Sequence, residues 1–335
     1  MKIISTFILL FITFFSFAQE RCGFGLAEKE NSKNSIWLRQ KAEFEYQLRQ
    51  DIAKSEGANL RVQDKLLKIP VVFHVIHNNS ANIIGGVENA NITDEQIKSQ
   101  IVVLNEDYRR KAGTKGFNTN AVGADMEIEF ELATKDPSGK ASIGITRTFV
   151  DKATWNFLGD NQMIANKIRW DYEKYLNIWV MKSDGRTIGY SGFPYDSKLI
   201  GLGATAQDIL DQNIFDGVII DYRYVGNCCG VQGTTYNFGR TTTHEIGHYL
   251  GLLHPNGDES CGSDYCDDTP QIESLNNSTT CPISSSTCSG IKRTNMIENY
   301  MDYSPDRCMN VFTNDQKKKG EVGIEFEYKA TKIIN

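Results

Sequence analysis

The chain has few histidines, no strong excess of charge and, beyond its first 18 residues, no long apolar run. Its 335 residues include five histidines and carry a net charge of −6 at neutral pH. That modest charge gives no reason to expect nucleic acid or an anionic membrane as a partner. No other apolar stretch approaches the roughly 20 residues that a helix needs to cross a bilayer. We see no internal repeat, proline-rich linker or low-complexity tract, so the composition indicates one large globular domain or two small ones.

Residues 1–18 have the pattern of a secretory signal. Lys2 supplies a positive charge, and the apolar run Ile3–Phe15 is too short to span a bilayer comfortably. Small residues at positions 16 and 18 predict cleavage before Gln19. We therefore expect a protein that is secreted, extracellular or periplasmic, and in which disulfides are permitted.

Three of the five histidines fall within the eleven residues from His244 to His254, which read HEIGHYLGLLH. Positions four apart share one helix face, so His244 and His248 can offer imidazole nitrogens to a single ion. Glu245 lies on the adjoining edge, where it can hold a metal-bound water. Gly251 is predicted to end the helix, because glycine accepts the left-handed conformation, and His254 then returns as a third ligand.

Three protein ligands and one open position are typical of catalytic rather than structural zinc. The alternative is a surface helix whose histidines are satisfied by other partners. The glycine and the third histidine at this spacing make that alternative much weaker than it would be for HExxH alone. For the other two histidines, His74 and His77, packing in a buried strand is favoured over a ligand role.

Strands interleaved with helices indicate an α/β fold. Apolar runs and alternation predict strands at 69–76, 126–133, 176–181, 189–194 and 216–222, of which 189–194 is read as an irregular edge strand. Helices are predicted at 94–110, at 162–175 and from about 240 through the histidine motif. Thr93 should cap the first of these, with Gln96 completing a capping box. Regular structure is expected to be sparse after residue 255.

The chain has eight cysteines, and five of them lie between 261 and 308 in a segment rich in Ser, Thr, Asn and Gly. Cross-links add most stability to loops with little core, on the order of 2–4 kcal/mol each. The other three are Cys22, Cys228 and Cys229. Spacing alone does not give their connectivity.

A turn that contains a methionine, Asn299-Tyr-Met-Asp-Tyr-Ser304, follows the histidine motif. A methionine turn after such a helix resembles the metzincin clan of zinc peptidases. Together with 299–303, the segments 239–245, 267–270 and 308–313 narrow the resemblance to the pappalysin family. The resemblance covers about residues 69–316.

The resemblance implies an α/β metzincin-type catalytic domain. A mixed twisted sheet and the active-site helix would form its N-terminal half, and an irregular, disulfide-linked segment its C-terminal half. It implies a zinc endopeptidase acting on proteins or peptides, with His244, His248 and His254 as zinc ligands and Glu245 as general base. Met301 would form the floor of the site, a role that is itself core packing. Tyr303 would stabilise the oxyanion, with plain packing as its alternative.

Cys22, in Arg21-Cys22-Gly23, is similar to the cysteine switch of several metzincins. We expect a pro-segment over 19–60, whose thiolate fills the fourth zinc position, and a catalytic domain over 61–335 that divides near 254/255. The alternative is that Cys22 pairs with another thiol. Because characterised relatives prefer Arg or Lys after the scissile bond and process themselves, activation cleavage is predicted before Arg61.

A pocket that binds a basic side chain of the substrate needs a carboxylate, and Asp306 is the candidate. The alternative is that Asp306 caps a turn after Pro305. The acidic loop of Asp267, Asp268 and Thr269 suits a structural calcium ion, and the alternative is a solvated loop. The resemblance also implies disulfides Cys261–Cys288 and Cys281–Cys308. Cys266 could then pair with Cys228 or Cys229, although an odd number of thiols would remain once Cys22 is set aside.

Two other functions remain open at this stage. One is a non-catalytic zinc-binding module that kept the fold, which the retained Glu245 argues against. The other is a metzincin of another family with a different specificity. The short charged segment from Glu321 to Asn335 leaves no room for an appended domain, so either the protein is simply secreted or the sequence is truncated.

Overall fold

The computed structural model describes residues 20–31, 66–192 and 215–327, apart from 173 and 233, together with residues 42, 45, 46, 49, 50 and 53. The predicted signal at 1–18 and the predicted activation site at Arg61 lie outside these residues. Within the described part of the chain, no helix is long and apolar enough to cross a bilayer.

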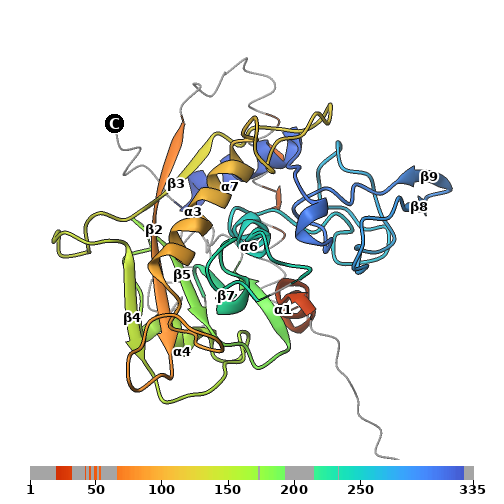
Figure 1. The fold of residues 1–335 in the computed structure, drawn as a ribbon. Helices are drawn as coiled ribbons and strands as arrows, with labels where there is room; N and C mark the ends of the chain where they lie inside the picture. The colour runs from red at the N-terminus through yellow and green to blue at the C-terminus, as the bar shows by residue number, and fades with distance from the viewer. Residues whose placement is uncertain are drawn as a thin grey trace, which may run out of the picture.

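One mixed sheet forms the frame of the molecule (Figure 1). Its strands are β1 (Glu20–Cys22), β2 (Leu67–His77), β3 (Ile128–Leu132), β4 (Ile145–Phe149), β5 (Leu176–Met181), β6 (Thr187–Ser191) and β7 (Val218–Asp221). The order is β1-β6-β7-β5-β2-β3, with β4 also paired to β2. All pairs are parallel except β6 with β7. The α/β architecture with a mixed sheet is as predicted.

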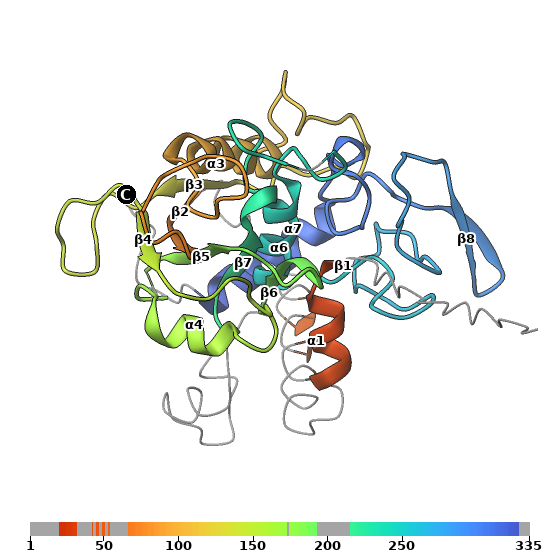
Figure 2. The ribbon, with the colours of Figure 1, turned by 60° about the horizontal axis from the view of Figure 1, so that its bottom comes forward.

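The central strands are buried on both faces, which explains why they read as continuous apolar runs. Successive residues of β5 alternate between two cores: Ile178 and Val180 pack on one face, and Trp179 and Met181 on the other. The first face is covered by α3 (Asp94–Tyr108) and α6 (Arg240–Tyr249), and the second by α4 (Asn161–Lys167). Figure 2 shows these helices on opposite sides of the strands.

Two helix predictions are only partly right. Thr93 caps α3 by accepting a hydrogen bond from the Gln96 backbone N–H, at 3.1 Å. The Gln96 side chain does not complete a capping box, because it donates to the carbonyls of Tyr222 and Val225. The helix predicted at 162–175 ends at Lys167. The amide of Asn177 instead holds the following backbone, accepting from Trp170 N at 2.8 Å and donating to Trp170 O at 3.2 Å.

The C-terminal half contains more regular structure than predicted. It holds a hairpin of β8 (Ser285–Cys288) and β9 (Ile291–Thr294), the short 3₁₀ turn η2 (Asp306–Cys308) and the helix α7 (Asn314–Glu327). A second 3₁₀ turn, η1 (Tyr222–Tyr224), comes earlier in the chain, directly after β7. The start of α7, which was not predicted, does have a sequence signal. Thr313 Oγ1 accepts from Gln316 N at 3.2 Å, and Gln316 Oε1 accepts from Thr313 N at 3.0 Å, which is a capping box.

The cysteines form three disulfides within the described residues: Cys228–Cys229, Cys261–Cys288 and Cys281–Cys308. The last two are the pairs that the resemblance implied. The suggested link from Cys266 to Cys228 or Cys229 is wrong, because the latter two pair with each other and lie against α3, where Cys228 Sγ contacts Glu95 O. Cys266 and Cys22 are buried free thiols, so Cys22 does not pair with another cysteine.

His74, on β2, is a core histidine, as predicted, and should make the fold less stable in mild acid. Its Nδ1 lies 2.7 Å from Thr146 Oγ1, its Nε2 lies 2.9 Å from Asn177 Oδ1, and burial lowers its pKa to about 4. An unfolded histidine has a pKa near 6.5. Between these two values the unfolded chain binds a proton that the folded chain does not, so stability falls as the pH drops through this window.

The expected loss is about 3 kcal/mol of unfolding free energy on going from pH 7 to pH 4, with no contribution from His74 above pH 7. Urea unfolding of the wild type and of His74→Gln at pH 7.5 and 4.5 measures it. The variant should lose less stability between the two pH values than the wild type does. An equal loss in both proteins would show that His74 is not the source of the acid sensitivity.

Candidate metal centre

The helix α6 begins and ends at glycines in the left-handed region. Gly239, with φ of 76°, precedes its first residue, and Gly251, with φ of 91°, turns the chain out of it as predicted. The carboxylate of Asp306, from a later part of the chain, caps the N-terminus of α6. It accepts hydrogen bonds from the backbone N–H groups of Phe238 at 2.9 Å and Arg240 at 3.2 Å. The proposed capping of a turn after Pro305 is therefore wrong, since this carboxylate caps α6.

The three histidines of the motif converge on one point. Their Nε2 atoms are 3.1–3.3 Å apart, and all three side chains are fully buried. Each Nδ1 faces an acceptor: Tyr300 O for His244, Leu252 O for His248 and Asp258 Oδ1 for His254, at 2.7, 2.8 and 2.6 Å. These contacts leave the Nε2 lone pairs free to bind one common metal ion.

This donor set fits zinc. Four-coordinate zinc with Zn–N bonds of about 2.0–2.1 Å places its nitrogen ligands roughly 3.4 Å apart, close to the separations seen here. Burial lowers the pKa of both His244 and His248 well below the ordinary value, so their rings are neutral, as metal ligands must be.

Cys22 lies at the position that the histidines leave open. Its Sγ and the three imidazole nitrogens are within 4.8 Å of one another, and within the described part of the chain no other such group of His, Cys, Asp and Glu side chains occurs. The next turn of the N-terminal segment, the helix α1 (Phe24–Asn31), reinforces the contact. The Phe24 ring stacks on His248 with centroids 4.0 Å apart. Figure 2 shows α1 beside α6.

Glu245 also faces Cys22, with 3.4 Å between the thiol and Oε2. Burial raises the pKa of this carboxyl to about 8. On its other side the Glu245 carboxylate packs directly against the backbone of β6. A Cβ at Gly189 would lie 2.4 Å from Glu245 Oε1, so only glycine is accommodated there. The sequence carries no local signal for the role of Gly189, because its neighbour in space, Glu245, is 56 positions away in the chain.

The methionine turn packs directly beneath α6. Met301 is buried, and a Cβ at Gly247 would lie 2.3 Å from its Sδ. The preceding Tyr300 donates from its hydroxyl to Asp107, which also pairs with Arg240 at the start of α6. Tyr303 lies beside the metal centre with its ring 5.0 Å from that of His254, and its hydroxyl donates to Cys22 O at 3.4 Å. Burial raises its pKa well above the usual value, so the hydroxyl keeps its proton.

The buried Asp306 carboxylate also faces the buried side chain of Arg21. One guanidinium nitrogen lies 3.3 Å from Asp306 Oδ1, and the other donates to the carbonyl of Ser304 and contacts Met309 Sδ. The guanidinium carbon lies 4.8 Å from the centroid of the Tyr236 ring. Arg21 and Tyr236 were missed in the sequence; the only available signal for Arg21 was its place next to Cys22.

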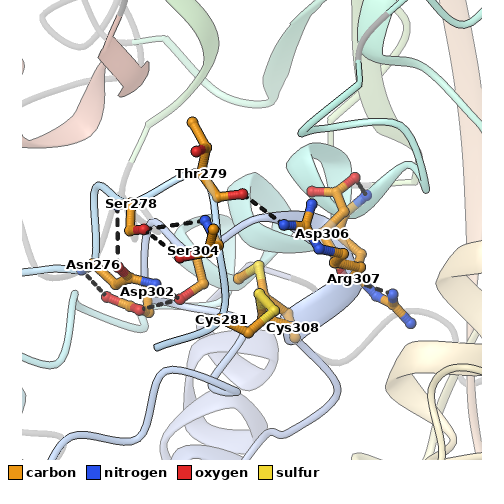
Figure 3. Close-up of a disulfide and its surroundings, with 12 residues drawn as sticks. Asn276, Ser278, Thr279, Cys281, Asp302, Ser304, Asp306, Arg307 and Cys308 are labelled. Carbon is orange, nitrogen blue, oxygen red and sulfur yellow. Dashed lines mark hydrogen bonds between the residues drawn. A yellow bond between two sulfur atoms is a disulfide. The ribbon is translucent and has the colours of Figure 1, made fainter. Parts of the chain in front are cut away.

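Figure 3 shows the Cys281–Cys308 disulfide, which lies beside the segment that carries Asp306. The disulfide joins the segment that carries Asp302, Ser304 and Asp306 to the loop at 276–281. Asn276 strengthens the junction, because its backbone N–H donates to Asp302 Oδ1 and its amide donates to Ser304 Oγ, at 2.9 and 2.8 Å. The backbone carbonyls of Asp302 and Ser304, which accept from Arg21, are therefore held in place by Asn276 and by the disulfide.

The acidic loop does not gather all three of its predicted calcium ligands. Asp267 and Asp268 face α7 instead, where Asp267 N donates to Asp315 Oδ2 and Asp315 N donates to Asp268 Oδ2. Thr269 turns the other way, and its hydroxyl lies 2.7 Å from a carboxylate oxygen of Asp264 and 2.9 Å from Cys266 O.

Known proteins resemble this chain in both sequence and fold. The family model described as Pregnancy-associated plasma protein-A, a peptidase family, matches residues 159–325. An extracellular metalloprotease of Colletotrichum graminicola is 29% identical over 307 residues, covering 90% of each chain. One from Verticillium alfalfae is 32% identical over 265 residues, covering 78% of this chain and 76% of that protein.

Two solved structures from Tannerella forsythia share the fold. A promirolysin mutant is 32% identical with a TM-score of 0.70, covering 92% of this chain and 95% of that one. Mature mirolysin in complex with a cleaved peptide is 35% identical with a TM-score of 0.66, covering 79% and 96%. The fold, the donor set and these relatives define a zinc metalloendopeptidase. The chain belongs to the pappalysin family.

Proposed function

We propose that this protein is a secreted zinc endopeptidase that is made as a zymogen and cuts peptide bonds before arginine or lysine. One observation carries the proposal. Two consecutive residues of the N-terminal segment contact the candidate site, Cys22 at the three histidines and Arg21 at Asp306, and these contacts support both the latency and the proposed specificity. Export is supported by the relatives, which are named extracellular metalloproteases.

Zinc, when held by His244, His248 and His254, supplies a water of lowered pKa and polarises the scissile carbonyl. Glu245 is the general base. Its carboxylate lies beside the open position, accepts a proton there and then passes it to the leaving amine. Once Cys22 has left, the protonated hydroxyl of Tyr303 is free to donate to the carbonyl oxygen as negative charge develops on it. Met301 holds the floor of the site through its packing on Gly247.

The contact of Asp306 with Arg21 supports the proposed specificity. A buried carboxylate opposite backbone carbonyls selects a cation, and Arg21 demonstrates that a guanidinium fits. Substrate backbone would pair with β6. The sequence predicted that β6 lies at an edge of the sheet, whereas β1 pairs with it in parallel register. When β1 departs, the edge of β6 becomes open to another extended peptide.

The N-terminal segment is proposed to be the latency device. Residues 1–18 would be the signal, 19–60 the pro-segment and 61–335 the catalytic domain, with activation before Arg61. Besides Arg21 and Cys22, the segment contributes β1 and the Phe24 ring on His248. N-terminal sequencing of the processed protein tests this boundary, and a start elsewhere would refute it.

The experiment that tests the function is a peptide-library digest with the processed protein, with and without a zinc chelator. We expect cleavage sites enriched in Arg or Lys on the C-terminal side of the cut, and no cleavage with chelator present. Cleavage without that enrichment would indicate a different specificity within the family. Cleavage that persists after zinc removal would overturn the proposed chemistry.

Replacing Cys22 by alanine in the full chain should release latency. The variant loses the thiol at the fourth position and should show peptidase activity before processing, at least about tenfold above the wild-type zymogen. Hydrolysis of an arginine-containing peptide, measured before any cleavage of the chain appears on a gel, gives the result. Cys266→Ala is the matched control, since Cys266 is the other buried free thiol and lies outside the metal group. Equal latency in both variants would exclude the switch.

We also propose that calcium binds at the loop that was singled out for it, shifted toward Asp264. The hydroxyl of Thr269 lies within hydrogen-bond distance of both the Asp264 carboxylate and the Cys266 carbonyl, and oxygen donors are what calcium prefers. Millimolar calcium should raise the melting temperature of the wild type but not of Asp264→Asn. An equal rise in both proteins, or none in the wild type, counts against the site.

A further inference from the structure

The N-terminal segment has a second contact with the catalytic domain, formed by residues other than those at the metal centre. Glu45 is 5% exposed, and its Oε1 lies 3.5 Å from the ammonium of Lys319 on α7. Arg49 lies over the ring of Tyr265, with 4.5 Å between the guanidinium carbon and the ring centroid. The same ring lies 5.2 Å from Lys319 Nζ, so the two contacts are continuous. We call Tyr265 and Lys319 the Tyr265–Lys319 surface.

The two segment residues are four positions apart and helical, which places them on one face, one turn from each other. The neighbouring Tyr46 is 56% exposed. One face of the segment therefore carries an acidic group for Lys319 and a cation for the face of Tyr265.

The ion pair is buried, and this gives it consequences that a surface pair lacks. The side chain of Lys319 is 1% exposed and that of Glu45 is 7% exposed. Among the described residues, the ammonium also donates to the carbonyl of Asp264, at 3.2 Å. Truncating one member of a buried, hydrogen-bonded charge pair at an interface mainly raises the dissociation rate, so this contact should control how long the segment stays bound.

We propose that the Tyr265–Lys319 surface is a docking site for Glu45 and Arg49, and that it retains the severed pro-segment on the enzyme after cleavage. The inference rests on the proposed zymogen function. Arg21 and Cys22 form one anchor and Glu45 and Arg49 a second. A segment tethered at two places rebinds at one while the other is held, which lengthens its residence by far more than either contact alone. Cleavage of the chain and onset of activity are thus separate events.

The test measures how fast the cut segment leaves. The full chain is cleaved, by itself or by an added endopeptidase that cuts before residue 61, and the fraction of residues 19–60 that co-elutes with the enzyme is followed by size exclusion and mass spectrometry. We expect Glu45→Gln and Lys319→Met each to release the segment at least tenfold faster than wild type, and the double variant to release it no faster than the singles. Tyr46→Ala is the matched control and should release it at the wild-type rate.

Equal release rates in wild type and Glu45→Gln would overturn the docking site. Additive effects of the two variants would also do so, because they would show that the two residues do not act on each other. Glu45→Gln keeps the test decisive if Lys319→Met fails to fold, since it alters only the segment. Peptidase activity is measured separately, so a chain that cuts no peptide but still releases the Glu45→Gln segment faster would refute the proposed function and leave the docking site standing.

Discussion

Replacing Glu245 by alanine should lower kcat/KM for peptide hydrolysis by about 10²–10⁴-fold while zinc stays bound, which is the range for loss of a general base. The three imidazoles keep their Nδ1 acceptors in the variant, because none of those acceptors is Glu245. Both proteins are compared in a Cys22→Ala background, so that latency does not hide the effect. Hydrolysis rates and zinc content by atomic absorption give the two readings.

Glu259→Ala is a matched control, since Glu259 is an exposed glutamate in the loop that follows the histidine motif. It should change neither the rate nor the zinc content. If Glu245→Ala retains most of its activity, another group is the base. If it loses zinc together with activity, Glu245 supports the metal centre and its catalytic role is not demonstrated. A chain that binds zinc but never cuts, with Glu245 intact, would instead match a non-catalytic module.

Asp306→Asn should cost at least about 30-fold in kcat/KM for peptides with arginine after the cut, and far less for the same peptides with leucine there. The carboxylate is fully buried, and loss of one partner in a buried hydrogen-bonded charge pair costs about 2–5 kcal/mol. Asparagine keeps an oxygen that can accept from Phe238 and Arg240, so the cap of α6 is largely preserved. The measurement is the ratio of the two rates, again in the Cys22→Ala background.

The ratio separates specificity from structure. If both peptides lose activity equally, Asp306 acts through the cap of α6 and not through the substrate. Melting temperature and zinc content provide an independent check on folding. With Cys22 present, Asp306→Asn should also weaken latency. The Arg21 side chain would be bound less tightly, because its guanidinium loses its only carboxylate partner among the described residues.

Long apolar segments were predictable because burial on both faces leaves little choice of residue. β2 and β5 were predicted within two residues of their observed bounds for this reason. The second half of the helix predicted at 162–175 failed because Asn177, on the next strand, competes for its backbone. The helix α7 was missed although Thr313 and Gln316 form a capping box, because its charged sequence suggested an irregular tail.

The metal ligands were predictable because they are a local property of the chain. A helix puts His244 and His248 on one face whatever surrounds it, and Gly251 turns the chain at a fixed distance before His254. Asp258, which accepts from His254 Nδ1, lies in the turn just beyond and was overlooked, since a single aspartate there carries no periodic signal. It orients that ring as the carbonyls of Tyr300 and Leu252 orient the other two.

The sequence by itself therefore determined the α/β class, the donor set for zinc and the family, because each depends on short-range spacing or on apolar periodicity. Only the tertiary structure decided what faces that donor set. Arg21 reaches Asp306 across 285 positions, Cys22 meets Glu245 across 223, and β1 covers the edge of β6. Such contacts depend on where the sheet and the C-terminal loops place distant side chains, and residue order along the chain carries no signal for them.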